Sequence, residues 1–247
     1  MTAPVFLVDS LEGVSPGSPL TLDGPEGRHA VSVRRLKPGE EIVLTDGHGR
    51  GAAGVVLRTE GKDTLIVQAD SLPVEPEPRP RITVVQALPK GDRGELAVET
   101  MTETGVDAIV PWSAARCVTQ WKGERGAKSL GKWRATAREA GKQSRRLRFP
   151  DVAEAATTKQ IAALLAEVDF AAVLHEEGAE PLATAELPAE GSIVLVVGPE
   201  GGVSPEELAV FEAAGARPYR LGRTVLRTST AGTAGVALLL GRTGRWS

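Results

Sequence analysis

Short runs of apolar and β-branched residues, separated by turns, occupy the first 70 positions of the chain. The runs lie at residues 5–8, 41–44, 54–57 and 64–69. Glycine and proline turns stand between them, such as KPG at 37–39 and DGHG at 46–49. Many short strands with turn signals between them predict a small β-barrel.

A proline-rich segment follows these runs. Residues 72–80 read LPVEPEPRP, with four prolines in nine positions. Proline lacks the backbone N–H and fixes φ, so this density predicts a stiff extended linker rather than a helix or strand. We therefore expect a first domain at residues 1–72, a linker at 73–80 and a second domain at 81–247.

The pattern after residue 80 is an alternation of apolar strands and helical segments. Strands are predicted at 81–88, 107–112, 170–174, 193–197 and 218–221, and helices at 92–104, 129–143, 159–168, 205–214 and 230–240. This alternation predicts an α/β domain with a parallel sheet covered on both faces. Sheets of this class bind ligands beyond the carboxyl ends of their strands.

A glycine-rich segment, GPEGGVSPEEL at 198–208, follows one of these strands. Ser204, Pro205 and Glu207 have the pattern of a capped helix start, so residues 198–203 form the preceding loop. Glycines in such a loop let backbone amides approach a ligand. The phosphate-binding patterns GxxxxGK[ST] and GxGxxG are absent, and Glu200 would repel phosphate. The alternative is a turn that uses glycine for its geometry alone.

Two further segments follow neighbouring predicted strands. LGRTVLRTSTA at 221–231 leads into a helix of small residues, and LHEEG at 174–178 follows the preceding strand. Three such loops at one edge of a parallel sheet predict a pocket. The small residues at 231–235 allow close packing against another helix, within this chain or in a second subunit.

The distribution of charge is more informative than its total. The net charge of the 247 residues is −3, but residues 116–148 contain eleven Lys and Arg against two Glu. Such clustering is typical of a surface that meets a phosphate-rich partner, with a solvated basic helix as the alternative. Residues 1–75 hold seven basic and eleven acidic residues, which leaves Arg28, Arg34, Arg35 and Lys37 as the candidate RNA face.

Several classes of protein are disfavoured. A lone Cys117 excludes an intramolecular disulfide and fits a reducing compartment. No run approaches the roughly 20 apolar residues of a membrane span, and the first residues lack a signal-peptide pattern, so we expect a cytoplasmic protein. His29, His48 and His175 do not have metal-ligand spacing, and we expect no metal.

Five segments in order along the chain resemble the RsmE family of ribosomal RNA methyltransferases, which modify N3 of a uridine in 16S rRNA. They are HAVSVRRLKPGEEIVLTDGHG at 29–49, ALPKGDRGELAVETMTETGVDAIVPW at 87–112, REAGKQSRRLRFPDV at 138–152, GPEGG at 198–202 and LGRTVLRT at 221–228. The resemblance covers nearly the whole chain.

The resemblance implies a fold and a cofactor. The first domain is expected to be a PUA-like β-barrel and the second an α/β SPOUT methyltransferase domain, whose C-terminal segment forms a trefoil knot around S-adenosylmethionine. It also implies a homodimer that acts on 16S rRNA of the small ribosomal subunit. The residues expected to bind the cofactor are Leu174, His175, Val197, Gly198, Pro199, Glu200, Gly201, Gly202, Leu221, Gly222, Leu226 and Thr228.

The reaction suggests roles for two residues. Methylation of N3 requires loss of the N3 proton, so the site must supply a base or stabilise the uracil anion. Arg227 is our candidate for the second role because it is permanently charged and donates two hydrogen bonds; a structural salt bridge is the alternative. Glu200 is a candidate base, or else it orients its loop.

RNA contacts are expected from both domains. Basic side chains hold the RNA through phosphates while the target base is flipped out of its stack. Trp112, Trp121 and Trp133 flank the basic segment and could stack on bases, although the position of Trp112 at a strand end favours the core for that residue. The residues expected to bind RNA are Arg28, Arg34, Arg35, Arg134, Arg138, Lys142, Arg145 and Arg146.

Two positions depart from the family pattern. Ser229 stands where a glutamate is usual, and Lys142 where an acid is common. Alternative functions are a PUA and knot RNA-binding protein without catalysis, a SPOUT methyltransferase for a different RNA, and a nucleotide-dependent enzyme of the doubly wound type. Missing nucleotide-binding patterns count against the last.

Overall fold

The computed structural model describes residues 3–246 of the chain. They separate into two compact units, each with a hydrophobic core of its own. The first unit runs to Glu77 and includes residues 141–149, and the second holds residues 78–140 and the chain from 150 onward. The division at residue 77 lies inside the expected linker, whereas the sequence placed residues 141–149 with the second domain.

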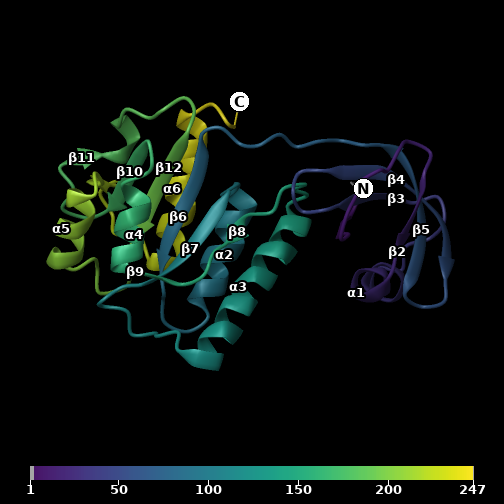
Figure 1. Cartoon of the computed structure of the whole chain (residues 1–247), viewed down its shortest axis with the longest axis horizontal. Coiled ribbons are helices and arrows are strands. Elements are labelled where there is room, and N and C mark those ends of the chain that lie inside the picture. Colours follow the sequence, from purple (N-terminus) through teal and green to yellow (C-terminus); the bar gives the residue numbers. More distant parts are fainter. Residues whose placement is uncertain (1–2, 247) are drawn as a thin grey trace. The chain divides into compact units, whose positions relative to one another are not determined.

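The first unit is a curled sheet around its core (Figure 1). Its strand order is β1-β3-β4-β5-β2; β1 and β3 are parallel and the other neighbours antiparallel. Phe6, Ile42, Leu44, Leu65 and Val67 are buried in the centre. The elements are β1 (Val5–Leu7), β2 (Pro19–Leu22), α1 (Gly24–Arg28), the π-helical turn η1 (His29–Val33), β3 (Glu41–Thr45), β4 (Gly51–Glu60) and β5 (Thr64–Ser71).

The sequence pattern missed β2, α1 and η1. One residue of β2, Leu22, is buried, so the strand shows no clear alternation. Glycine and proline open α1, and neither residue favours a helix interior, although proline is well suited to the first turn.

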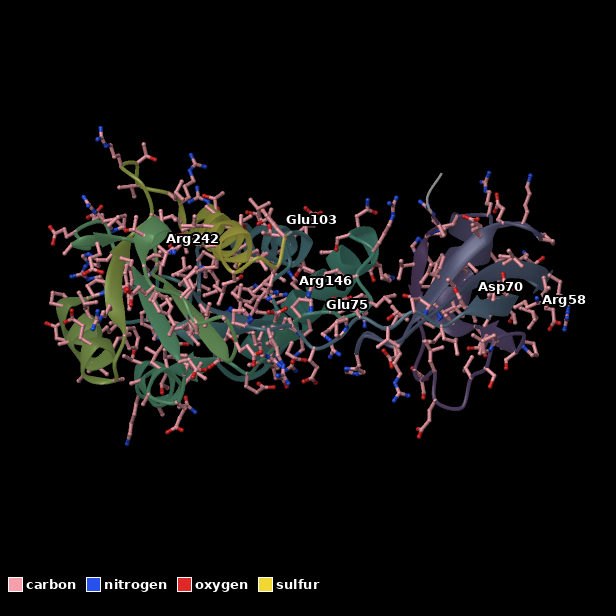
Figure 2. All side chains as sticks on the ribbon, turned by 90° about the horizontal axis from the view of Figure 1, so that it is seen from above. Arg58, Asp70, Glu75, Glu103, Arg146 and Arg242 are labelled. Atoms are coloured by element: carbon pink, nitrogen blue, oxygen red, sulfur yellow. The ribbon has the colours of Figure 1, made fainter. Side chains whose placement is uncertain are left out.

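Residues 141–149 are bonded to the first unit through their backbone. Phe149 N donates to Gly47 O at 2.8 Å, and Gly49 N donates to Leu147 O at 3.0 Å. Glu75, labelled in Figure 2, accepts hydrogen bonds on Oε2 from the backbone N of Leu147 and of Arg148, each at 2.9 Å. This segment is therefore part of the first unit although some sixty residues of the second precede it.

The second unit contains a fully parallel sheet. Within the described residues its strand order is β11-β13-β10-β12-β6-β7-β8, with β9 also paired to β7. The strands are β6 (Arg81–Ala87), β7 (Ala108–Ser113), β8 (Asp151–Val152), β9 (Ala156–Thr157), β10 (Phe170–Leu174), β11 (Glu180–Pro181), β12 (Ser192–Val197) and β13 (Arg217–Arg220). The expected α/β class is confirmed; the knot stays a prediction.

Helices cover both faces of this sheet. Side chains on both sides of its central strands are therefore buried, such as Val84 and Val85 on β6. Helix α6 packs on β6 and β12 and against α2, and α4 packs against α5 and β7 (Figure 1). The helices are α2 (Arg93–Thr104), α3 (Gly123–Gln143), α4 (Thr158–Leu165), the 3-10 turn η2 (Leu182–Thr184), α5 (Pro205–Ala213) and α6 (Thr228–Arg242). Within residues 3–246 every helix is too short or too polar to cross a membrane.

The small residues of α6 pack inside this chain. A Cβ on Gly232 would come within 2.5 Å of Met101 Sδ on α2, and one on Gly235 would meet Leu195 of β12. Thr233 and Thr100 of α2 share a hydrogen bond of 2.6 Å between their hydroxyls. The close packing expected for this helix is therefore with α2. At the other end of α6, Arg242, labelled in Figure 2, donates to the carbonyl of Leu182 at 3.3 Å.

Candidate active site

Three loops at the carboxyl edge of the sheet enclose a cavity of about 540 Å³. They follow β10, β12 and β13, which are neighbouring parallel strands. All three loops therefore leave the sheet on the same side, as the sequence predicted. Every residue expected to bind the cofactor lines this cavity, and so do the catalytic candidates Arg227 and Glu200.

The glycine loop after β12 is a tight turn as well as a cavity wall. Gly202 N donates to Pro199 O at 2.8 Å, and Gly202 has a φ of +73°, which side chains rarely adopt. A Cβ on Gly198 would come within 2.9 Å of Val203 Cγ2. Glycine is thus required here for backbone geometry, while the same loop presents Gly198 to Gly202 to the cavity.

Glu200 contacts the segment at the start of α2. Its Oε1 accepts a hydrogen bond from Lys90 N at 3.1 Å and lies 4.0 Å from Arg93 Nη1. These contacts join the glycine loop to the loop between β6 and α2. They favour an orienting role for this carboxylate, because one of its oxygens is already engaged.

Arg116 is a cavity residue that the sequence did not single out as part of the site. Its Nη1 donates to Gly201 O at 2.9 Å, which holds the loop after β7 against the glycine loop. The basic cluster at 116–148 included Arg116, but a contact between residues 85 positions apart leaves no signal in a single sequence.

Glu207 fixes the start of α5, the helix that follows the glycine loop. The expected capping box is present, since Glu207 N donates to Ser204 Oγ and Ser204 N to Glu207 Oε2, both at 3.2 Å. The same carboxylate accepts from Ala115 N at 2.7 Å and from Thr158 Oγ1 at 3.0 Å. Because Glu207 is 5% exposed, these contacts satisfy a charge that water does not reach well.

Arg227 lines the cavity and is the N-cap residue of α6. Its carbonyl accepts from Thr230 N and Ala231 N, both at 2.9 Å. The side chain is exposed, and within residues 3–246 its guanidinium has no ion pair or hydrogen bond. Among the described residues of this chain, Arg227 thus forms no salt bridge of the kind that the alternative role requires.

The loop after β10 is shaped by backbone contacts with β13. His175 N donates to Tyr219 O at 3.0 Å, and Gly178 passes so close to β13 that a Cβ would come within 2.7 Å of the Tyr219 carbonyl carbon. The Nδ1 atom of His175 accepts from Glu177 N at 3.2 Å. His175 thus contributes to the shape of its own loop.

Two buried polar residues, one in the first turn of α6 and one in contact with it, lie near the cavity residue Thr228. Ser229, where the family resemblance leads us to expect a glutamate, is 3% exposed. Gln86, at the end of β6, donates from Nε2 to the carbonyls of Thr228 at 3.3 Å and Ala87 at 3.1 Å. Sequence reasoning missed Gln86, because it stands in an otherwise apolar strand.

Cys117 is buried in the loop after β7. Burial raises the pKa of its thiol, and the carboxylates of Glu207 and Glu200 add to the increase, against backbone hydrogen bonds that lower it. The thiol therefore stays protonated and unreactive near neutral pH.

The predicted RNA-binding residues have different surroundings. In the first unit Arg28, Arg34, Arg35 and Arg145 are exposed, and Arg146 is half-buried. In the second unit, Arg134 donates to Val152 O at 3.0 Å and to Glu154 at 2.9 Å, and Arg138 lies 3.7 Å from Glu139.

Lys142 is placed differently from the expectation. Its side chain is 7% exposed, and Nζ forms an ion pair of 2.7 Å with Glu26 of the same unit. Its ammonium is therefore engaged inside the protein and is not available to an RNA phosphate.

The core position favoured for Trp112 is confirmed, whereas the stacking on bases suggested for Trp133 is wrong because that ring is buried. Trp112 is fully buried against Phe211 at a ring separation of 5.2 Å, and Trp133 is 2% exposed. Trp121 is partly buried and packs edge-on against Trp133 at 4.9 Å. These rings hold the core of the second unit together.

Comparison with known proteins identifies two regions. Residues 75–240 match a family model described as an RNA methyltransferase domain, and residues 22–70 match one described as an RNA methyltransferase PUA domain. Together they match parts of both units.

Relatives and solved structures agree with these matches. The chain is 45% identical, over all of its length and 94% of the relative's, to ribosomal RNA small subunit methyltransferase E of Mycobacterium bovis. It is 28% identical to that of Bacillus subtilis over 85% of each chain. Two solved structures are each 27% identical over 98% of both chains: a Legionella pneumophila methyltransferase with bound SAM, at a TM-score of 0.86, and the Neisseria gonorrhoeae methyltransferase E bound to S-adenosyl methionine, at 0.85.

Proposed function

Because the chain belongs to the RsmE family of RNA methyltransferases, we propose that it transfers a methyl group from S-adenosylmethionine to N3 of a uridine in 16S rRNA. The cavity formed by three loops at the carboxyl edge of the parallel sheet carries this proposal. Solved structures similar over 98% of the chain contain the same cofactor.

The walls of the cavity fit this cofactor. A volume of about 540 Å³ lies in the usual range of pockets for small molecules. The lining includes apolar side chains suited to an adenine ring, such as Leu174, Val197 and Leu226. It also includes the backbone of the glycine loops. The described lining contains no lysine, and its carboxylates, Glu176 and Glu200, are compatible with a sulfonium cation.

The bound cofactor supplies an electrophilic methyl group, and the protein must prepare the uracil to accept it. Removal of the N3 proton leaves negative charge on the ring and its oxygens. Arg227, which has no partner among the described residues, is placed to stabilise this charge through two parallel hydrogen bonds. Glu200 is held by Lys90 N, so we assign it the positioning of the glycine loop.

We propose that both units hold the RNA. The first unit contributes Arg28, Arg34, Arg35, Arg145 and Arg146, and α3 of the second contributes Arg134 and Arg138. Phosphate contacts of this kind position the RNA without reading its sequence. The target base is then extruded from its stack into the cavity.

We also propose that the protein works as a homodimer in the cytoplasm, where ribosomal subunits are assembled. The family resemblance supports the dimer. Sedimentation equilibrium distinguishes a particle of twice 25.9 kDa from the single chain.

Methyl transfer from labelled S-adenosylmethionine tests the proposed reaction. The acceptors are small ribosomal subunits from a strain without the enzyme, and mass spectrometry identifies the modified nucleoside. We expect N3-methyluridine in 16S rRNA. A different nucleoside would refute the proposed position, and cofactor binding without any transfer would indicate an RNA-binding protein that has lost catalysis.

A further inference from the structure

The cavity carries more positive charge than its cofactor requires. Among the described lining residues there are five arginines and two glutamates. S-adenosylmethionine offers one carboxylate, beside a sulfonium and an ammonium, so it can engage only a part of these five guanidinium groups. Their charge therefore suits a second, anionic partner at the same cavity.

The arginines fall into two sets according to their partners. On the side of the glycine loop, Arg93 lies 4.0 Å from Glu200 and Arg116 donates to Gly201 O. Their charge or hydrogen-bonding capacity is thus partly used within the protein. The other three, Arg220, Arg223 and Arg227, come from the end of β13 and the segment that leads to α6.

This second set is largely unoccupied. Within residues 3–246 the guanidinium of Arg223, like that of Arg227, has no ion pair or hydrogen bond, and Arg220 has one long contact of 3.5 Å with Ala179 O. All three side chains belong to exposed residues. An exposed arginine remains hydrated until an anion arrives, and its planar fork matches two phosphate oxygens.

We propose that Arg220 and Arg223 form a phosphate-binding subsite for the RNA strand that flanks the target nucleotide. This inference rests on the proposed function, and it separates two roles along one segment. Arg227 faces the reacting base, whereas Arg220 and Arg223 bind the backbone that carries it.

The test measures binding of a fluorescein-labelled oligouridylate 12-mer and of the same oligomer with a neutral methylphosphonate backbone. The variant is Arg223→Ala, with Arg220→Ala/Arg223→Ala as the stronger case. Arg217→Ala is the matched control, because Arg217 is an exposed arginine of the same strand β13 that does not line the cavity. Calorimetry measures S-adenosylmethionine affinity in parallel.

We expect Arg223→Ala to weaken binding of the charged oligomer roughly 3- to 10-fold at low salt. The slope of log K against log[salt] should become less steep by about 0.7 for each phosphate of the single strand that the variant no longer neutralises. Binding of the neutral oligomer, the cofactor affinity and the Arg217→Ala control should stay at wild-type values. An unchanged slope, an equal loss in Arg217→Ala, or a loss of cofactor affinity would overturn the subsite.

This result can be separated from failure of the proposed function, because the oligomer assay involves no methyl transfer. If the wild-type protein methylates no subunit but Arg223 still governs binding of the charged oligomer, the proposed reaction is wrong and the subsite stands. If the wild-type protein does methylate subunits and Arg223→Ala leaves both the affinity and KM unchanged, the reaction stands and the subsite is refuted.

Discussion

At the scale of single residues, two carboxylates beside the cavity differ in how fully the protein satisfies them. Glu207 accepts three hydrogen bonds from other residues and is buried, whereas Glu200 accepts one from a backbone N–H and is partly exposed. A buried carboxylate with several donors is a structural group. Glu207 therefore positions the helix that follows the glycine loop.

Substitution Glu207→Gln tests this role. The amide keeps one acceptor oxygen but turns its NH2 group toward a backbone N–H that needs an acceptor, so stability should fall by about 1–3 kcal/mol. Denaturant unfolding measures the change. Glu206→Gln, at the exposed neighbouring position, is the control and should lose less stability than Glu207→Gln, because its carboxylate interacts mainly with the start of the helix. Equal midpoints for both variants would remove the proposed support.

Substitution Arg227→Ala tests the stabilisation of the uracil anion. Loss of a charged donor that acts mainly in the transition state should lower kcat by a factor on the order of 10²–10³, with cofactor affinity largely kept. Single-turnover methyl transfer and calorimetry give the two quantities. Arg227→Lys keeps the charge but lacks the planar guanidinium, so its kcat should lie between those of the wild type and of Arg227→Ala. Unchanged turnover in Arg227→Ala would exclude the residue from the mechanism.

At the scale of elements, the site depends on loops held against neighbouring strands through backbone. The loop after β10 is bonded to β13 through His175 N and Tyr219 O, and Gly178 lies against the same strand. β13 is fixed in turn because it pairs with β10 and β11. A side chain at Gly178 would therefore push the loop after β10 away from β13.

Substitution Gly178→Ala should weaken both the fold and the site. A Cβ would meet the backbone of Tyr219 and Arg220 at 2.7–2.8 Å, so we expect a loss of about 1–3 kcal/mol and weaker cofactor binding. Gly131→Ala is the matched control, since Gly131 lies in α3 with no neighbour within 4 Å of a Cβ. Alanine should stabilise that helix by about 0.5–1 kcal/mol. If both substitutions changed the free energy of unfolding in the same direction, the close packing of Gly178 would not explain its effect.

At the scale of the whole molecule, the first unit is completed by a segment that lies in the second half of the sequence. Residues 141–149 supply Lys142 to the ion pair with Glu26 and bond to Gly47 and Gly49 through their backbone. Helix α3 belongs to the second unit up to Ala140 and to the first from Gly141 onward. The first unit therefore contains residues that a division by sequence alone assigns to the second.

Substitution Lys142→Met should destabilise the first unit. It leaves the partly buried Glu26 without its cation, and we expect a loss of about 2–3 kcal/mol, below the full value for a buried pair because Glu26 remains 22% exposed. Hydrogen exchange should accelerate in β1 and residues 141–149 more than in β6 or β12. Arg145→Met, at an exposed basic position of the same segment, should exchange like the wild type. Exchange that accelerates equally in both units would refute the assignment.

The sequence alone determined the features that depend on neighbouring residues. Apolar periodicity predicted the main strands and helices of the second unit, and Ser204, Pro205 and Glu207 located the start of α5. Since all strands of the α/β sheet are parallel, their order along the chain also predicted that three loops would meet at one edge. The family resemblance then indicated S-adenosylmethionine as the cofactor.

Tertiary structure decided the contacts between residues far apart in sequence. Arg116 reaches Gly201 across 85 positions, and Lys142 reaches Glu26 across 116. Charge along the chain could not reveal that Lys142 is engaged inside the protein while Arg223 is exposed at the cavity. The physical reason is that burial and ion pairing depend on which surfaces the fold brings together, whereas helix caps, turns and periodicity are properties of adjacent residues.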